Sequence, residues 1–328
     1  MPLLKFNRME KSTHKVEVVQ IKLEPHPNAD KLSIVRVFDG YTVCVNTADW
    51  QDGALAAYIP PDSIVDTTRT EFAFLGDHKH IKVKKLRGIV SMGLMIPAPE
   101  GAKLGDDVAE ALGVTHYEPL ITFESDGDCE VAPEGYFPKY DIDSMLRYAR
   151  VFTPGETVWV TEKIHGANSR YCWRAGRMWA GSRTNWKKQS DSNQWWAGLK
   201  QHPEIEEWCK THDDCTLYAE LYGNVQSLKY GVNGVKIAVF DILRRTEWVN
   251  PEDAMILGPR LPWVPLISNG MPFDLEALKA LSDGPSTMPG AKNIREGVVV
   301  KPKLGRSDPT IGRVILKIVG NDYMAKSK

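Results

Sequence analysis

One segment decides how the chain is interpreted: Val158-Trp159-Val160-Thr161-Glu162-Lys163-Ile164-His165-Gly166-Ala167-Asn168-Ser169-Arg170. Its first residues predict a strand, Lys163 lies at the end of that strand, and Gly166 closes a turn. A deprotonated lysine can attack phosphorus or carbon, and glycine lets another group approach the backbone closely. The pattern Lys-x-x-Gly nevertheless begins at Lys85, Lys163 and Lys317 alike, so these four positions alone do not identify a catalytic lysine.

The composition sets the broad class. The chain has 328 residues, enough for about two domains, with 25% charged and 42% hydrophobic residues as in ordinary soluble globular proteins. No apolar run approaches the roughly 20 residues that cross a bilayer, and no signal-peptide core is present. Five scattered cysteines without metal-site spacing predict reduced thiols. We therefore expect a cytoplasmic protein with no membrane segment, and a monomer.

Short strand-like runs separated by turns fill residues 14–97. Lys15–Ile21 and Ser33–Val37 alternate in the manner of strands, and Asp39-Gly40 is a hairpin signal. No long helical pattern interrupts them. This spacing predicts a small β-barrel as the N-terminal domain, to which we assign residues 1–120.

The strongest local positive charge lies in His78–Gly88. Strand alternation would place Ile81 and Val83 on one face and Lys82 and Lys84 on the other. Such a basic face is either simply solvated or part of a groove that follows nucleic-acid phosphates. The candidate RNA-binding residues are Lys82, Lys84, Lys85 and Arg87.

Proline, glycine and acidic residues accumulate before residue 140 and predict a linker at 121–140. The second domain, 141–328, mixes strands and helices. Its expected strands are Glu156–Thr161, Ser169–Trp173, Met178–Ala180, Thr216–Leu221, Lys236–Ile242, Gly297–Lys301 and Val314–Val319. Its expected helices are Gln194–Lys200, Pro203–His212 and Leu275–Ser282, with a short capped helix at Asp143–Tyr148.

Charged residues interrupt several of these apolar strands. Glu220 and Asp241 lie inside expected strands, Glu296 precedes one, and Lys301 and Lys317 occur in two more. Apolar strands hold charges only where these are paired or line a cleft. Lysines suit phosphates, and carboxylates suit Mg²⁺ and its waters. The pattern therefore predicts a phosphate-and-metal site.

With these residues in hand, the chain resembles the lysine-adenylylating nucleotidyltransferases, the superfamily of ATP-dependent ligases and capping enzymes. The motifs that carry the resemblance occur in the expected order: Lys163–Gly166, Ser182-Arg183, Glu220, Phe240-Asp241, Glu296–Val299 and Lys317. Within the superfamily the chain is most similar to RNA ligases with an OB domain on the N-terminal side. Residues 14–97 are similar to that domain through Asn28-Ala29-Asp30, Lys85–Gly88 and Gly93-Leu94.

The resemblance implies an α+β fold, in which an N-terminal OB-type β-barrel precedes an ATP-grasp-like nucleotidyltransferase domain of antiparallel sheets and helices. It also implies a three-step reaction. Neutral Lys163 attacks the α-phosphorus of ATP and releases pyrophosphate, giving lysyl-AMP. The AMP passes to an RNA 5′-phosphate, and an RNA 3′-OH then attacks that adenylylated end and expels AMP. The implied cofactors are ATP and Mg²⁺ or Mn²⁺, and the implied partner is RNA with 3′-OH and 5′-phosphate ends, which we expect in a nicked duplex.

The resemblance assigns roles residue by residue. Lys163, Glu296 and Lys317 are implied to be catalytic, and Asn168 is implied to bind the RNA 5′-phosphate. Glu296 would hold the waters of the metal, and Asp241 would contact the metal through water. The implied nucleotide-binding residues are Glu162, Ile164, Arg183, Glu220, Ile237, Phe240 and Lys301, with Ile237 packing the adenine.

Two departures and two alternatives remain open. Many relatives have Asp at the position of His165, and some have a second lysine at the position of Val319. A capping-type guanylyltransferase would use GTP and normally has a C-terminal OB domain, for which we expect no room after residue 320. A non-catalytic RNA-binding protein is the other alternative, because His26–Leu32 is similar to tRNA-binding OB modules of aminoacyl-tRNA synthetases. That interpretation leaves the six motifs unexplained.

Overall fold

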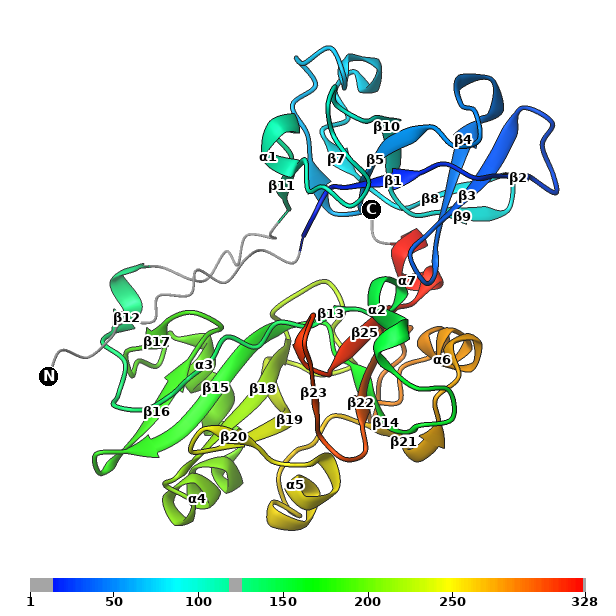
Figure 1. Cartoon of the computed structure of the whole chain (residues 1–328). Helices are drawn as coiled ribbons and strands as arrows, with labels where there is room; N and C mark the ends of the chain where they lie inside the picture. Colours follow the sequence, from blue (N-terminus) through cyan, green and yellow to red (C-terminus); the bar gives the residue numbers. More distant parts are fainter. Residues whose placement is uncertain (1–13, 118–125, 327–328) are drawn as a thin grey trace, which may run out of the picture. The chain divides into compact units, whose positions relative to one another are not determined.

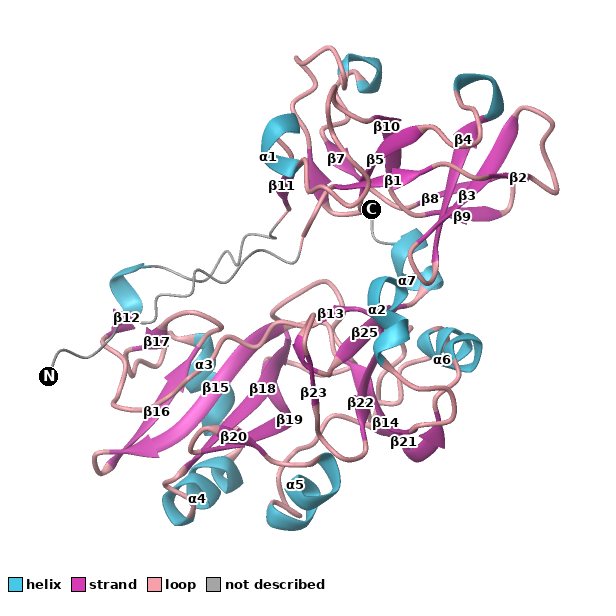
Figure 2. Ribbon diagram, viewed as in Figure 1, coloured by secondary structure: helices cyan, strands magenta, loops and turns pink. Residues whose placement is uncertain are grey.

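The computed structural model describes residues 14–117 and 126–326, and the chain divides into two compact units between residues 119 and 120 (Figure 1). Among the described residues, no helix is long and apolar enough to cross a membrane. Strands predominate in both units, as Figure 2 shows. Each unit is described below by itself.

The first unit is built from small antiparallel sheets. The strands of its central sheet, β1-β5-β10, pair in the registers Glu17↔Tyr58 and Met95↔Tyr58. Successive residues of β5 point into two different cores, Ala57 and Ile59 into one and Ala56 and Tyr58 into the other, because side chains alternate across a strand. The elements are β1 (Glu17–Gln20), β2 (Leu23–Pro25), β3 (Leu32–Val37), β4 (Tyr41–Asn46), η1 (Thr47–Asp49), β5 (Leu55–Ile59), β6 (Ser63–Ile64), η2 (Ala73–Leu75), β7 (His80–Ile81), β8 (Lys84–Leu86), β9 (Ile89–Ser91), β10 (Leu94–Pro97), α1 (Ala109–Leu112) and β11 (Thr115–His116).

The basic segment is not the single strand that its alternation predicts. It contains β7 and β8, which belong to different sheets, with Lys82 between them. β8 and β9 form a hairpin whose turn has Arg87 at φ 47° and Gly88 at φ 95°. The Asn28 side chain donates to the Arg87 carbonyl at 3.0 Å, which joins the Asn-Ala-Asp loop to this hairpin. The cationic side chains are all exposed: Lys79, Lys82, Lys84, Lys85 and Arg87.

Two large sheets and the small two-stranded sheet β23-β24 form the second unit (Figure 1). The seven-stranded sheet has the order β12-β17-β16-β15-β18-β19-β20, and the five-stranded sheet has the order β13-β25-β22-β14-β21. All pairs are antiparallel except β13 with β25. The strands are β12 (Cys129–Glu130), β13 (Asp143–Ser144), β14 (Thr157–Lys163), β15 (Ala167–Arg174), β16 (Arg177–Gly181), β17 (Trp186–Lys187), β18 (Cys215–Gly223), β19 (Val235–Arg244), β20 (Glu247–Trp248), β21 (Leu266–Pro272), β22 (Gly297–Pro302), β23 (Ser307–Asp308), β24 (Gly312–Arg313) and β25 (Leu316–Val319).

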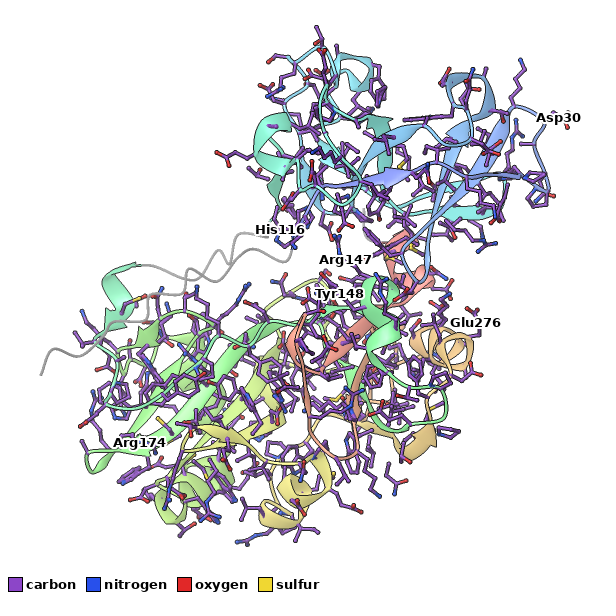
Figure 3. All side chains as sticks on the ribbon, viewed as in Figure 1. Asp30, His116, Arg147, Tyr148, Arg174 and Glu276 are labelled. Carbon is purple, nitrogen blue, oxygen red and sulfur yellow. The ribbon has the colours of Figure 1, made fainter. Side chains whose placement is uncertain are left out.

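Helices cover the outer face of each sheet. Trp195 of α3 and Ile205 of α4 pack against the seven-stranded sheet, and Met145 of α2 and Leu278 of α6 pack against the five-stranded sheet. Tyr148, labelled in Figure 3, joins the second of these cores. The helices are η3 (Asp126–Asp128), α2 (Met145–Tyr148), η4 (Ala149–Val151), α3 (Gln194–Lys200), α4 (Pro203–Thr211), α5 (Pro251–Leu257), α6 (Leu275–Ser282) and α7 (Asn321–Lys326).

The inner faces of the two sheets meet in an aromatic cluster. Tyr218 from the seven-stranded sheet and Val299 from the five-stranded sheet belong to this one cluster. A β-bulge in β19 shapes it, because Tyr218 pairs with Asp241 while Ala219 pairs with Val239. The extra residue, Phe240, therefore lies on the inner face together with Asp241.

The stretch predicted as a linker, 121–140, packs against the second unit where it is described. β12 pairs with β17 at the edge of the seven-stranded sheet, and Tyr140 is buried in the aromatic cluster. Residues 121–125 lie outside the described residues. Proline and glycine predict irregular backbone correctly here, but they do not reveal that an irregular segment is packed down by its aromatic side chains.

Candidate functional site

Lys163 lies at the end of β14, where it faces a carboxylate. Its Nζ is 2.8 Å from Oε1 of Glu296, and the two side chains are 22% and 11% exposed. The pairing Lys163↔Gly297 brings them together, because it places Glu296 directly beside the end of β14. Burial disfavours the charged lysine, but the carboxylates of Glu296 and Glu220 outweigh burial and raise the pKa of Lys163.

Two glycines allow this close assembly. A Cβ at Gly166 would lie 2.1 Å from the backbone oxygen of Leu221, so the turn after Lys163 can lie against β18 only without a side chain. A Cβ at Gly297 would lie 2.0 Å from the backbone oxygen of Ile318, which is the approach of β25 to β22. The glycines of Lys-x-x-Gly and Glu-Gly-Val-Val thus have a steric basis.

Glu220 and Asn168 face each other across β18 and β15 in the seven-stranded sheet. Burial raises the pKa of Glu220 to about 8, with Lys163 and the Gly166 backbone acting against it. Asn168 Oδ1 is buried and accepts no hydrogen bond from the described residues. An acceptor in that position suits a polar ligand, since burying it without a partner costs free energy.

His165 occupies the position where many relatives have an aspartate. Its ring nitrogens lie 3.1 Å from the hydroxyls of Ser227 and Tyr323, and Nδ1 is 3.8 Å from Glu296 Oε2. Its backbone N–H donates to the Tyr230 hydroxyl at 2.7 Å. Burial lowers the pKa of His165, which favours the neutral ring. The departure therefore replaces an expected carboxylate with a neutral group held by hydroxyls.

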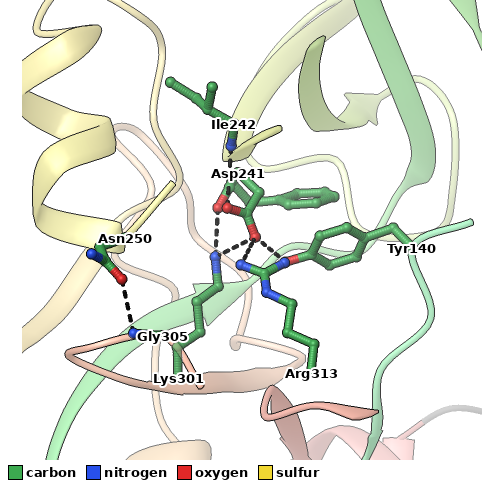
Figure 4. A network of polar contacts seen from close by, with 8 residues as sticks. Tyr140, Asp241, Ile242, Asn250, Lys301, Gly305 and Arg313 are labelled. Atoms are coloured by element: carbon green, nitrogen blue, oxygen red, sulfur yellow. Dashed lines mark hydrogen bonds and ion pairs between the residues drawn. The ribbon is translucent and has the colours of Figure 1, made fainter. Parts of the chain in front are cut away.

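A second charged cluster lies deeper between the sheets (Figure 4). Asp241 Oδ2 accepts from the Tyr140 hydroxyl at 2.5 Å and lies 2.8 Å from both Lys301 Nζ and Arg313 Nη2. Its Oδ1 accepts from the Ile242 N–H at 3.1 Å. Burial opposes ionisation of Asp241, but Arg313 and Lys301 hold its pKa below the usual value.

This cluster bears on the expected roles of Asp241 and Lys301. Both oxygens of Asp241 are already engaged by protein donors, so the expected contact of Asp241 with a metal through water is not supported. Lys301 Nζ also donates to the Phe240 carbonyl at 2.9 Å, and burial lowers its pKa to about 8. Lys301 is thus held within the protein, on the site-facing side of β22.

Strand register places the three expected phosphate-binding lysines on one face of the five-stranded sheet. Lys163 pairs with Gly297, Lys301 pairs with Trp159, and Lys317 pairs with Val299. The intervening residues, such as Val298 and Val300, point to the opposite, helix-covered face. Val319 pairs with Gly297, so an apolar side chain stands where some relatives have a second lysine.

An apolar cluster adjoins Lys163. Ile164, Ala238 and Phe240 belong to it, which agrees with a nucleotide-base role for Ile164 and Phe240. The expected role of Ile237 in packing the adenine is wrong, because Ile237 points to the opposite face of the sheet and packs with Trp195. Simple alternation would place Ile237 and Asp241 on one face, and the bulge at Phe240 separates them.

Two further residues expected to bind the nucleotide, Glu162 and Arg183, contact other parts of the protein. The buried Glu162 carboxylate accepts three hydrogen bonds of 2.6 Å from the Ser286 hydroxyl and from the N–H and hydroxyl of Thr287. Its side chain anchors this loop, which corrects the expected side-chain role at the nucleotide. Arg183 Nη2 lies 2.5 Å from Asp141 Oδ1 in a half-exposed ion pair.

The donor set decides whether a divalent metal fits. The described residues contain no group of three or more His, Cys, Asp or Glu side chains that could enclose an ion. Glu296 Oε2, however, is buried without a hydrogen-bond partner among those residues. A metal with most of its coordination from water and phosphate fits this arrangement, as Mg²⁺ commonly binds at phosphate-transfer sites.

Several residues that shape the site belong to no sequence motif. Tyr140 lies in the predicted linker, Arg313 belongs to the short β24, and Tyr323 comes from α7. Only pairing across more than 60 residues of sequence brings each to its partner. Arg170 is the last residue of the quoted segment, but no side-chain pattern indicates its hydrogen bonds to the backbone carbonyls of Ser182 and Phe137.

Comparison with solved structures identifies relatives of the whole fold. A Naegleria gruberi RNA ligase mutant solved with ATP and Mn has a TM-score of 0.79 at 22% identity, covering 94% of this chain and 98% of that one. An apo mutant of the same ligase has a TM-score of 0.77 at 22% identity, covering 94% and 97%. At this identity the likeness establishes the fold, including the predicted order of OB domain and nucleotidyltransferase domain.

Sequence comparisons match both units. A phenylalanine–tRNA ligase beta subunit from Chlamydia pneumoniae is 29% identical over 119 residues, and the chain spans only 14% of that protein. An OB-fold domain model matches residues 14–98. The RNA ligase family model matches residues 156–319, which contain Lys163, Glu220, Glu296 and Lys317. The chain therefore belongs to the RNA ligase family.

Proposed function

We propose that this RNA ligase is ATP-dependent and joins RNA 3′-OH and 5′-phosphate ends through lysyl-AMP and a 5′-adenylylated RNA. The observation that carries the proposal is the position of Lys163, a half-buried amine 2.8 Å from Glu296 at the end of β14, a strand paired on both sides. The Naegleria ligase structures with ATP and Mn, or with AMP and Mn, support the choice of nucleotide and metal. We further propose that the protein is a cytoplasmic monomer that repairs nicked RNA duplexes.

Lys163 must lose its proton before it can attack the α-phosphorus. In the resting protein the neighbouring carboxylates keep the proton on, since they raise the pKa of Lys163. Any change that withdraws the negative charge of Glu296 from Nζ therefore favours the neutral amine. Lys317, on the same face of the sheet, supplies positive charge for the transferring phosphoryl group.

Glu296 would hold the divalent metal, Mg²⁺ or Mn²⁺, through Oε2, which no described residue engages in a hydrogen bond. A metal bound there neutralises charge on the transferring phosphate. His165, tied to Ser227 and Tyr323, lies beside the same oxygen, with its Nδ1 3.8 Å from Oε2. Asp241, expected to contact the metal through water, is left out of this assignment because Lys301 and Arg313 neutralise it.

The nucleoside binds between the sheets in this proposal. Its base packs against the cluster of Ile164 and Phe240, and its ribose hydroxyls bond to Glu220. A carboxyl group with a pKa near 8 is largely protonated at neutral pH, so Glu220 can donate as well as accept. Lys301 stands on the same face for the phosphates, provided that it exchanges its bond to Asp241 for one to the ligand.

RNA contacts come from both units. Asn168 Oδ1 is buried beside Glu220 and has no hydrogen bond from residues 14–117 or 126–326, so it can accept one from the terminal nucleotide or its ordered water. The amide of the same side chain binds the 5′-phosphate. In the first unit the exposed Lys82, Lys84, Lys85 and Arg87 neutralise backbone phosphates.

The test is incubation with labelled ATP or GTP followed by mass spectrometry and a sealing assay. We expect AMP on the peptide that contains Lys163 and sealing of a nicked RNA duplex. GMP on that peptide would identify a capping-type enzyme. Absence of any nucleotide adduct, in a folded protein that still binds RNA, would favour a non-catalytic OB-fold binding protein.

A second test concerns the first unit. Replacing Lys82, Lys84, Lys85 and Arg87 by alanine should leave AMP attachment intact and flatten the salt dependence of RNA binding. The slope of log K against log salt should decrease by about 0.7 per lost contact on single strands. The exposed Lys200 and Lys210 of the second unit, replaced by alanine, provide the matched control. An unchanged slope in the quadruple variant would remove this surface from the proposal.

A further inference from the structure

Residues 137–141, hereafter the strap, are fastened to the inner face of the seven-stranded sheet by side chains from different strands. Arg170 of β15 donates to the Phe137 carbonyl at 3.2 Å, and the Tyr218 hydroxyl of β18 donates to the Pro138 carbonyl at 2.9 Å. Tyr140 donates in turn to Asp241 of β19 at 2.5 Å (Figure 4). The final residue of the strap, Asp141, is the ion-pair partner of Arg183.

Arg170 hydrogen-bonds to both of the segments that carry the two partners of that ion pair. Besides its bond to the strap, its Nε donates to the carbonyl of Ser182 at 2.8 Å, and Ser182 directly precedes Arg183. Ser182 is also held by its N–H bond to the Asn185 carbonyl at 2.7 Å. One guanidinium therefore fixes both the backbone that carries Arg183 and the strap that carries Asp141.

The ion pair cannot fix Arg183 unaided. Arg183 and Asp141 are 45% and 44% exposed, and exposed pairs contribute about 0 to 1 kcal/mol. A second means of fixing Arg183 is its backbone, which Arg170 holds through the carbonyl of the preceding residue, Ser182. Support from a buried group is what allows a half-exposed side chain to meet a ligand in a fixed place.

The environment of Arg170 is unusual for a cation. The side chain is 3% exposed, makes no ion pair with any described residue, and lies 4.9 Å from the Trp186 ring. Burial lowers the pKa of Arg170, and Tyr218 acts in the opposite direction. Only the planar fork of arginine can bond to Ser182 and Phe137 together, whereas a lysine at this place can satisfy one carbonyl.

We propose that Arg170 is a positioning residue that fixes Arg183 for contact with the phosphate at an RNA end. The inference rests on the proposed function, in which Arg183 meets phosphates or the terminal nucleotide, and it assigns that contact to the RNA rather than to ATP. Arg183 is half exposed, whereas the Lys163–Glu296–Glu220 group is largely buried, so a ligand that extends over the surface reaches Arg183 more readily.

The experiment measures two steps separately in Arg170→Lys, Arg170→Met and Arg183→Ala: attachment of AMP to Lys163, and sealing of RNA that is already 5′-adenylylated. Sealing should fall about tenfold to a hundredfold in Arg170→Met and less in Arg170→Lys, with AMP attachment within about twofold of wild type. Arg177→Lys, on the adjacent β16, is the matched control and should change neither step. Cooperative melting establishes that each variant is folded.

A double-mutant cycle tests whether Arg170 acts through Arg183. If it does, Arg170→Lys adds no further loss of sealing in the Arg183→Ala background. Additive losses, or equal losses of both steps in the folded Arg170 variants, would overturn the inference and make Arg170 a general support of the domain. Failure of the proposed function is separate, because wild type itself would then neither acquire AMP nor seal RNA.

Discussion

Lys163 and Lys301 offer an instructive comparison. Both lie on the same face of the five-stranded sheet, and each amine is 2.8 Å from a carboxylate oxygen. Their pKa values nevertheless move in opposite directions. Lys163 has two acidic neighbours, which raise its pKa despite burial. Lys301 has one, Asp241, which it shares with Arg313, and burial lowers the pKa of Lys301 to about 8.

The difference shows that ease of deprotonation does not by itself select the nucleophile. Lys301 loses its proton more readily, but its amine donates to the Phe240 carbonyl and to Asp241 inside the protein. Lys163 holds its proton more tightly, yet one oxygen of its partner Glu296 has no hydrogen bond from the part of the chain that the structure describes, and can turn to a ligand. A reactive lysine needs a partner that can release it. The following predictions test that distinction.

The largest effect is expected for Lys163→Ala, which should abolish AMP attachment because no other amine is placed to form the phosphoramidate. Lys301→Ala should leave Lys163 able to acquire AMP, at a reduced rate. Peptide mapping after incubation with labelled ATP is the measurement. An AMP-peptide containing Lys301, Lys317 or Lys85 would contradict the assignment.

Asp241→Asn should destabilise the protein strongly, by about 3 to 5 kcal/mol, because it leaves Lys301 and Arg313 buried without their counter-charge. Urea unfolding followed by tryptophan fluorescence provides the free energy. Asp214→Asn, which breaks exposed pairs with Arg244 and Arg245, is the control and should cost less than about 1 kcal/mol. Equal losses in both variants would mean that the buried cluster contributes no more than a surface pair.

Glu296→Ala should slow AMP attachment by about a hundredfold or more, or ~3 kcal/mol, because the transferring phosphoryl group loses its electrostatic support. Stability should change less than in Asp241→Asn, since Lys163, which loses its partner, is 22% exposed, whereas Lys301 is 7% exposed. Single-turnover labelling at limiting Mg²⁺ is the decisive assay. Near wild-type labelling there would rule out the metal role.

The smallest effect is expected for Glu220→Gln, and it concerns the pH dependence of stability. Burial raises the pKa of Glu220 to about 8, so the folded state binds this proton more tightly than the unfolded state does. Stability from this group is therefore present below the unfolded pKa, about 4.5, and is lost as pH rises through 8. Glu220→Gln should lose less stability than wild type between pH 6 and pH 9 in thermal melts. Parallel curves would refute the shifted pKa.

Local signals allowed the sequence to predict much of the fold. α3 and α6 begin and end at the predicted residues, because Asn193 and Asp274 cap their first turns with hydrogen bonds to Trp195 and Ala277. β21 was not predicted, since Leu266–Pro272 contains glycine and proline and is mostly exposed. It is a strand only because β14 pairs with it.

Residue type at strand ends was enough to select Lys163, Glu220 and Glu296, which the fold brings into one group, and their roles stay predictions. Prediction failed where long-range geometry decides. The bulge at Phe240 moves Ile237 to the other face, and the loop at Thr287 takes up the carboxylate of Glu162. Neither event has a signature in the neighbouring residues, because each depends on a partner more than 20 residues away.

The strands that pair with β14 determine when, during synthesis of the chain, the environment of Lys163 can form. The strand that ends in Lys163 pairs only with β21 and β22, whose residues are translated more than 100 positions later. A ribosome-bound chain that has passed Lys163 thus carries the nucleophile on an unpaired strand, without Glu296 or Lys317. Such contacts of high sequence separation form late in folding. In the function proposed above, nascent and prematurely terminated chains would therefore acquire no AMP, because Lys163 meets Glu296 and Lys317 only when the last third of the protein has folded around it.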